Sequence, residues 1–196
     1  MITLCLDTSH KYLSIILIKD NKILDSYSEL CFKKQSEYIF VKLNQLFDNN
    51  KLVPKDISAI CISKGPGSYT GVRIAMTIAK TIYSLTDIKL YTISTLRLYA
   101  NNLSNTLVLM DARSKRAYYA VYDRSKCIIE DRVDYIDNIE FNDYNVVGDK
   151  SLIGEVDNYY NIGECFLNTI DYWLLEDDVD YVTPMYLKDN SDYLND

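Results

Sequence analysis

The same order of short β-rich segments occurs in both halves of this 196-residue chain. The segments are residues 2–7, 12–18 and 22–27 in the first half and 107–111, 117–122 and 127–130 in the second. In each half the first segment ends in an aspartate, Asp7 or Asp111. Asp20 and Asn21 separate two of the segments, and such residues tolerate the left-handed backbone of a tight turn. We therefore predict two meanders of three strands.

Helical and strand periodicities extend this plan. In the first half they predict a helix over residues 36–48, a buried strand over 57–63 and a second helix over about 70–85. In the second half they predict a short strand over residues 146–148 and an amphipathic helix over 163–175. The two halves therefore share a βββαβα order, the second in shortened form, which indicates a duplicated α/β protein.

The domain boundary is expected in the polar stretch from Asn101 to Asn105. We predict an N-terminal lobe over residues 1–101, a shortened C-terminal lobe over 102–188 and a disordered acidic tail over 189–196, because a short polar end has nothing to bury. No apolar run approaches the roughly 20 residues that a membrane helix needs. The first residues also lack the basic leader of a signal peptide, so we expect a cytoplasmic protein without membrane contact.

Charge and cysteine spacing narrow the classes of function. The formal net charge is −7, from 28 acidic and 21 basic residues, so the chain is not expected to bind a nucleic acid backbone by itself. The cysteines lie far apart without a CxxC pair, which argues against a disulfide framework and against a zinc site. They are interpreted as small buried apolar residues. The cysteines are Cys5, Cys31, Cys61, Cys127 and Cys165.

Half of the six glycines fall within residues 63–73, where the predicted strand at 57–63 leads into the predicted helix at about 70–85. Two interpretations of this glycine loop stay open. Its amides and the helix N-terminus could bind a phosphate, although the spacing matches neither G-x-G-x-x-G nor a Walker loop. Alternatively, the glycines allow a tight turn with close packing, and Ser68 or Thr70 caps the helix. The residues of interest are Gly65, Pro66, Gly67, Ser68, Tyr69, Thr70, Gly71 and Arg73.

The predicted helix at 70–85 is apolar on more than one face. Val72, Ala75 and Ala79 lie on one face, and Ile74 and Ile78 lie on another. The predicted helix at 36–48 carries a similar excess of apolar residues. A helix in a two-layer domain needs only one apolar face, so a second one predicts packing against another helix or another chain. The two helices therefore either cover each other or form a contact surface for a partner.

Six short motifs follow one another along the chain. They are Leu6-Asp7-Thr8-Ser9, Ser36-Glu37, the stretch from Gly65 to Ile74, Ile93-Ser94-Thr95-Leu96, Asp111-Ala112-Arg113 with Tyr118, and the stretch from Pro184 to Lys188. Taken in this order, they resemble the TsaB family, which supplies the dimerisation subunit of the complex that makes threonylcarbamoyladenosine in tRNA. Gln35 stands where that family usually has histidine. The resemblance implies an α/β fold of the actin-like or ASKHA type, with two RNase H-like lobes.

The resemblance also implies a function. It implies that the chain is a non-catalytic scaffold that binds the catalytic TsaD subunit through the two helices of the first lobe. The ATPase TsaE is expected to join this complex. The complex transfers a threonylcarbamoyl group to the adenosine beside the anticodon of tRNAs that read codons starting with A. The tRNA is contacted indirectly, and the chain alone is either a monomer or a homodimer through the same helices. The implied interface residues are Tyr38, Val41, Val72, Ala75, Met76, Ala79, Ile82 and Tyr83.

The residues argue against catalysis by this chain. The catalytic relatives hold a metal with two histidines at HxxxH spacing, whereas this chain has only His10, which is expected at the surface. Asp7, Asp111 and Arg113 are interpreted either as remnants of a nucleotide site or as turn caps. We expect no metal or cofactor in this chain, with ATP and a metal on the partner subunits. The alternatives are an ATP-binding ASKHA enzyme and a glycoprotease-like peptidase, which a single histidine disfavours.

Overall fold

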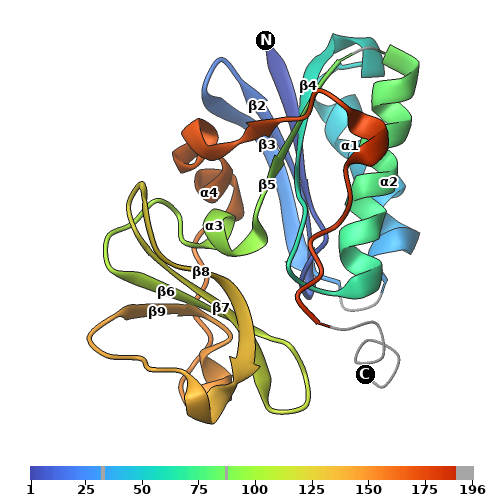
Figure 1. Ribbon diagram of the computed structural model, residues 1–196. Helices are drawn as coiled ribbons and strands as arrows, with labels where there is room; N and C mark the ends of the chain where they lie inside the picture. The colour runs from blue at the N-terminus through green and yellow to red at the C-terminus, as the bar shows by residue number, and fades with distance from the viewer. Residues whose placement is uncertain (32–33, 87, 189–196) are drawn as a thin grey trace.

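The computed structural model describes residues 1–31, 34–86 and 88–188, which form two sheets with helices around them (Figure 1). The tail over 189–196, for which the sequence predicts disorder, lies outside the described residues. Both predicted meanders are present. They consist of β1 (Ile2–Asp7), β2 (Tyr12–Lys19) and β3 (Lys22–Leu30) in the first sheet, and β6 (Thr106–Asp111), β7 (Arg116–Asp123) and β8 (Lys126–Tyr135) in the second.

The turn between β2 and β3 forms as its residues predict. Asp20 and Asn21 both have a left-handed backbone, with φ of 49° and 58°. Lys19 and Lys22 therefore face each other at the end of the hairpin. This pairing sets the register of the two strands and confirms the turn expected from an Asp-Asn pair.

Each sheet joins its meander to later strands in the same way. The later strands are β4 (Ile57–Ser63), β5 (Lys89–Ile93) and β10 (Leu174–Leu175) in the first sheet and β9 (Asn145–Gly148) in the second. The first sheet has the order β10-β5-β4-β1-β2-β3, and the second has the order β8-β7-β6-β9. β1 pairs in parallel with β4, and β6 pairs in parallel with β9. The duplicated strand plan is thus confirmed, and it puts Asp7 and Asp111 at corresponding strand ends.

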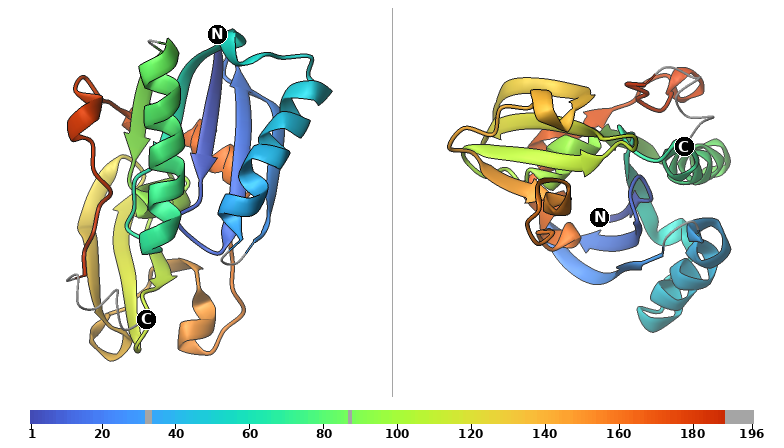
Figure 2. Two further views of the ribbon diagram at one scale, coloured as in Figure 1. Left: turned by 90° about the vertical axis from the view of Figure 1, so that its right-hand side faces the viewer. Right: turned by 90° about the horizontal axis from the view of Figure 1, so that it is seen from below.

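The helices divide between the two sides of the first sheet (Figures 1 and 2). α1 (Gln35–Asn49) and α2 (Tyr69–Thr86) cover the outer face, over an aliphatic core that β1, β2 and β4 supply. α3 (Thr95–Tyr99) and α4 (Ile162–Asn168) lie between the sheets. The core around them draws residues from both lobes, including Cys5, Ile16, Met110 and Phe166. The lobes therefore share apolar packing. Short 3₁₀ helices cover Pro54–Asp56, Ile136–Asn138, Lys150–Ile153, Ile170–Tyr172 and Val179–Tyr181.

The predicted helix over residues 163–175 is wrong in its second half. α4 ends at Asn168, and the hydroxyl of Thr169 donates to the carbonyl of Cys165 across 2.7 Å. A single 3₁₀ turn follows, and β10 then pairs antiparallel with β5. Hydrogen bonding to the free edge of β5 therefore replaces the helical hydrogen bonds that the apolar spacing had suggested. β5 and α3 themselves were not predicted.

The end of the described chain returns to the first lobe. Val179 and Val182 are buried in the core beneath α2, and the Met185 amide donates to the carbonyl of Lys64 across 2.7 Å. The Lys80 ammonium group donates to the carbonyl of Asp180 across 3.0 Å. This segment thus packs against the first lobe, although its sequence position lies in the stretch 102–188 that we assigned to the second.

Three cysteines fulfil the expectation of burial and two do not. Cys5, Cys61 and Cys165 are buried, Cys31 is half-buried, and Cys127 is exposed on β8 at the edge of the second sheet. All five are free thiols. Within residues 1–31, 34–86 and 88–188, no helix has both the length and the apolar character to cross a membrane.

Candidate functional site

The glycine loop joins β4 to α2 and packs against the turn that follows β1. A Cβ atom on Gly67 would lie 2.3 Å from the carbonyl oxygen of Ser9, and one on Gly71 would lie 2.1 Å from that of Thr8. The Ser68 amide donates to the Ser9 carbonyl across 2.7 Å. The glycines are therefore required for the close approach of two backbones, and one loop amide points into the protein rather than toward a ligand.

The first turn of α2 is capped from both sides. The Gly71 amide donates to the hydroxyl oxygen of Ser68 across 3.2 Å, which confirms the capping role expected of Ser68. The hydroxyl of Thr8 donates to the Gly71 carbonyl across 2.7 Å, and the Ala75 amide donates to the same hydroxyl oxygen across 3.2 Å. At the other end of the loop, the Thr95 amide donates to the Gly65 carbonyl. These contacts support the tight-turn interpretation over phosphate binding.

Asp7 is fully buried, and four donors surround its carboxylate. Oδ1 accepts from the Ser9 amide at 3.0 Å, the Ser9 hydroxyl at 2.6 Å and the Ser63 hydroxyl at 2.5 Å. Oδ2 accepts from the hydroxyl of Tyr99 at 2.6 Å. Burial, together with the charge of Asp7, raises the pKa of Tyr99 well above its ordinary value. Asp7 therefore caps the turn as one of our two interpretations predicts, and it also anchors α3.

Asp111 caps the corresponding turn of the second lobe. Its Oδ1 accepts from the Arg113 amide at 2.7 Å, and its Oδ2 lies 3.2 Å from the guanidinium nitrogen Nη1 of Arg113. Arg113, Ser114 and Lys115 all have a left-handed backbone, with φ of 65°, 54° and 59°. The Asp111 amide donates to Oδ2 of Asp149 across 2.8 Å. The turn-cap interpretation thus holds for both aspartates.

The His10 side chain lies between the lobes and is only 10% exposed, so the expectation of a surface histidine is wrong. Its Nε2 lies 2.8 Å from Oδ2 of Asp149, the residue directly after β9. The ammonium group of Lys11 lies 2.8 Å from Oδ1 of Asp149 and 2.7 Å from Oδ2 of Asp157. Sequence reasoning missed Asp149 and Asp157, which follow His10 and Lys11 by more than a hundred residues. The available signal was Asp149 itself, a carboxylate directly after a short apolar strand.

The carboxylate of Asp149 is held in its charged form. Burial by itself raises the pKa of such a group, but hydrogen bonds from His10, Lys11 and Tyr159 and the charge of His10 outweigh burial and place the pKa of Asp149 well below its usual range. The Tyr159 hydroxyl donates a short hydrogen bond to Oδ1. We call these groups, His10, Lys11, Asp149, Asp157 and Tyr159, the interlobe cluster.

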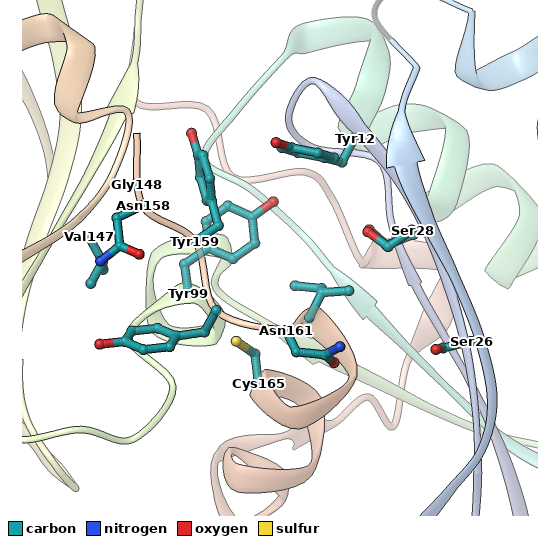
Figure 3. Close-up of a pocket in the computed structure, with 13 residues that line it drawn as sticks. Tyr12, Ser26, Ser28, Tyr99, Val147, Gly148, Asn158, Tyr159, Asn161 and Cys165 are labelled. Carbon is teal, nitrogen blue, oxygen red and sulfur yellow. The ribbon is translucent and has the colours of Figure 1, made fainter. Parts of the chain in front are cut away.

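A cavity of about 260 Å³ lies beside the interlobe cluster (Figure 3). Ser26 and Ser28 of β3 face Tyr99, Tyr159 and Cys165 across it. The described side chains that line it are hydroxyl, amide, aromatic, aliphatic and thiol groups, and none of them is charged. The lining therefore offers no cationic side chain to a phosphate.

A larger and more apolar groove of about 810 Å³ runs between α1 and α2 on the outer face. Figure 2 shows the two helices side by side on this face, with strands of the first sheet visible between them. Phe40 on α1 is 58% exposed, and its neighbours Tyr38 and Val41 are 41% and 51% exposed. Ile74 and Thr77 belong to the opposite wall, on α2. The helices therefore leave apolar surface uncovered, and the interpretation that they cover each other is wrong.

The structure corrects the set of interface residues that the resemblance implied. Val72, Ala75, Met76 and Ala79 are buried against the first sheet and belong to this chain's own core. They are spaced so that one face of α2 meets the sheet, and a partner cannot reach them. The accessible face of α2 instead carries Arg73, Ile74, Thr77, Thr81 and Ile82, while Tyr83 is half-buried.

The groove ends beside the glycine loop. The Tyr69 ring stacks on Tyr186, with centroids 5.1 Å apart, and the Arg73 guanidinium donates to the Tyr69 hydroxyl across 2.9 Å. Tyr69, Thr70 and Arg73 line the groove. These residues at the start of α2 thus belong to the same surface as the rest of the two helices.

Comparison with known proteins supports this architecture. Two structures from Pseudomonas aeruginosa, an uncharacterized protein with similarity to peptidase YEAZ and YeaZ itself, match with TM-scores of 0.80 and 0.77 at 17% and 18% identity. The matches cover 95% of this chain and 99% and 100% of those chains. At this identity the likeness shows the fold alone, and it confirms the α/β, actin-like ASKHA fold.

Sequence relatives identify the family. The TsaB protein of Bacillus subtilis is 32% identical over 134 residues, which are 66% of this chain and 58% of that protein. The TsaB protein of Buchnera aphidicola from Acyrthosiphon pisum is 27% identical over 179 residues, which are 82% of this chain and 80% of that protein. The family model described as TsaD, tRNA N6-adenosine threonylcarbamoyltransferase, matches residues 22–153. The chain therefore belongs to the TsaB family, within the larger family that the TsaD model describes.

Proposed function

We propose that this chain is a non-catalytic subunit that binds a TsaD-type enzyme and supports it in forming N6-threonylcarbamoyladenosine in tRNA. The modified adenosine lies beside the anticodon of tRNAs that read codons starting with A. The relatives in Bacillus and Buchnera are named tRNA threonylcarbamoyladenosine biosynthesis proteins, and the matching family model is that of a threonylcarbamoyltransferase. These names support a part in threonylcarbamoyladenosine formation, and the surface of the chain supports the role of a subunit that binds TsaD.

The observation that carries the role is the groove between α1 and α2. Exposed apolar side chains that gather in one groove are typical of a contact site for another protein. Its walls are two helices with apolar side chains at helical spacing, Phe40 on α1 and Ile74 on α2 among them. Such walls accept the ridge of a helix from a partner. We infer that a helical surface of TsaD occupies the groove.

The polar groups of the lobes support a role without catalysis. The carboxylate of Asp7 is enclosed by four donors, and His10 is engaged by Asp149. In the part of the chain that the structure describes, no group of three or more His, Cys, Asp or Glu side chains is placed to hold a metal ion. We propose that ATP and a metal belong to the partner subunits TsaD and TsaE, as the resemblance implies. The net charge of −7 assigns most tRNA contact to them as well.

The test is the mass of the complex with TsaD from the same organism, measured by size-exclusion chromatography with light scattering. The unmodified chain should form a one-to-one heterodimer. Phe40→Glu and Thr77→Arg place a charge in the groove at exposed positions, and each should weaken binding about tenfold or more. Val156→Glu is the matched control, because Val156 is an exposed apolar residue of the second lobe, 87% exposed, outside the groove.

Two outcomes contradict the proposal. Absence of any complex with TsaD, at low and moderate salt and with or without ATP, overturns the partner assignment. A complex that Val156→Glu and Phe40→Glu weaken equally overturns the assignment of the groove. A homodimer of the free chain that Phe40→Glu dissociates, and that TsaD displaces, would show that the same surface serves both contacts.

A further inference from the structure

The interlobe cluster connects the second lobe to the groove through a single turn. This turn, residues 8–11, follows β1, and both of its ends are engaged. Lys11 and His10 contact Asp149, which the second lobe carries on the loop after β9. Thr8 and Ser9 contact the glycine loop and the start of α2. One short segment therefore touches both the other lobe and one wall of the groove.

The same turn also holds the other wall of the groove. Gln35, the first residue of α1, donates from its side-chain amide to the carbonyl of His10 across 2.9 Å, and its side chain is buried. The carbonyl of His10 therefore positions the beginning of α1, while its ring binds Asp149. The first turns of both helices that line the groove thus contact this one turn.

The contacts on both sides of residues 8–11 are tightly packed. The backbones of Gly67 and Ser9, and those of Gly71 and Thr8, approach so closely that even a methyl group would not fit between them. At the other end Asp149 receives hydrogen bonds from His10, Lys11, Tyr159 and the Asp111 amide. A close-packed interior has low compressibility and transmits strain. A displaced turn therefore displaces the first turns of the helices that contact it.

We propose that Asp149 is a positioning residue for the partner groove: by holding residues 8–11, it sets the spacing of the first turns of α1 and α2 and thereby the affinity for the partner. This inference rests on the proposed function, because the affinity in question is that for TsaD. Asp149 does not line the groove, and its side chain is only 5% exposed. Its effect is therefore transmitted through the turn.

The experiment compares Asp149→Asn with Asp171→Asn. Asp149→Asn removes the charge that His10 and Lys11 share and keeps the size of the side chain. Asp171→Asn is the matched control, since Asp171 is an exposed aspartate that belongs neither to the interlobe cluster nor to the groove. Isothermal titration calorimetry with TsaD should show affinity about fivefold or more weaker for Asp149→Asn, and within about twofold of the unmodified chain for Asp171→Asn.

A second measurement separates positioning from general stability. Hydrogen exchange of the free chain should quicken in Asp149→Asn at the first turns of α1 and α2, near residues 35–39 and 67–75, while the end of α2 near Thr81 stays protected. Uniformly faster exchange would indicate a merely structural role and would overturn the inference. Asp149→Glu, which keeps the carboxylate, should recover part of both the affinity and the protection.

The outcomes distinguish the two proposals. If Asp149→Asn is folded by circular dichroism and binds TsaD like the unmodified chain, the positioning role of Asp149 is wrong and the proposed function stands. If the unmodified chain does not bind TsaD, the proposed function fails, and the exchange pattern alone decides whether Asp149 controls the helix ends. If Asp149→Asn does not fold, Lys11→Met tests the same link from the other side.

Discussion

The hydroxyl group of Tyr99 donates a hydrogen bond to Oδ2 of Asp7 across 2.6 Å, and both residues are buried between the two lobes. Tyr99 ends α3, the helix that leads from the first sheet toward the second, and Asp7 ends the first strand. The bond therefore attaches the connection between the lobes to the centre of the first sheet. It also occupies the carboxylate oxygen that the turn after β1 leaves free.

Replacement of Tyr99 by phenylalanine should destabilise the protein by roughly 1.5–3 kcal/mol, because a buried carboxylate loses one of its donors. Chemical unfolding in urea, followed by circular dichroism, measures the change. Tyr160→Phe is the matched control: Tyr160 lines the same cavity and is 39% exposed. It should change the free energy of unfolding by less than about 0.5 kcal/mol. Equal effects of the two substitutions would contradict the role given to the Tyr99 hydroxyl.

The glycines of the loop should differ sharply in their tolerance of alanine. Gly71→Ala would place a Cβ atom 2.1 Å from the backbone carbonyl oxygen of Thr8, which cannot move without displacing β1. We expect a loss of more than about 3 kcal/mol, or no folded protein. Gly154→Ala meets no atom within 4 Å, and its φ of +80° should cost only about 1 kcal/mol.

Expression of the two glycine variants and their urea midpoints check this prediction. A stable Gly71→Ala protein with an open phosphate site would contradict the tight-turn interpretation of the loop. It would favour the alternative in which the loop amides are available to a ligand. Equal losses for Gly71→Ala and Gly154→Ala would show that the close approach to Thr8 is not what makes glycine necessary at position 71.

Much of the fold could be predicted because its determinants are local. Strand runs ending at Asp7 and Asp111, a turn at Asp20, and a helix start at Ser68 each depend on residues within a few positions of one another. The helix over 163–175 failed for a non-local reason. Its apolar spacing is helical, but the free edge of β5 offers backbone partners that no nearby residue reveals.

The site was less predictable, because its residues meet only in the folded chain. The sequence shows that α2 is apolar on two faces, but not which face meets the sheet, so it places Ala75 and Ala79 in a partner interface, whereas the structure buries both. The sequence also predicts a surface position for His10, because its partner, Asp149, follows 139 positions later. The fold decides both cases through packing between elements that are distant in sequence.

The stability that Asp149 provides should depend on pH in a defined direction. In the folded chain the pKa of Asp149 is lowered, since hydrogen bonds from His10, Lys11 and Tyr159 outweigh the opposing effect of burial. Because folding lowers this pKa, the carboxylate stabilises the folded protein at pH values above the pKa that it has in the unfolded chain, which is about 4. This stabilisation is lost as the pH falls from there toward the folded-state pKa. The free energy of unfolding should therefore differ most between the unmodified chain and Asp149→Asn at pH 7, and the difference should narrow below about pH 4.

Urea titrations of both proteins at several pH values measure this difference, with the exposed Asp171→Asn as the control. A difference that stays constant from pH 7 to pH 3, or one that grows on acidification, would show that the charge of Asp149 does not stabilise the interlobe cluster.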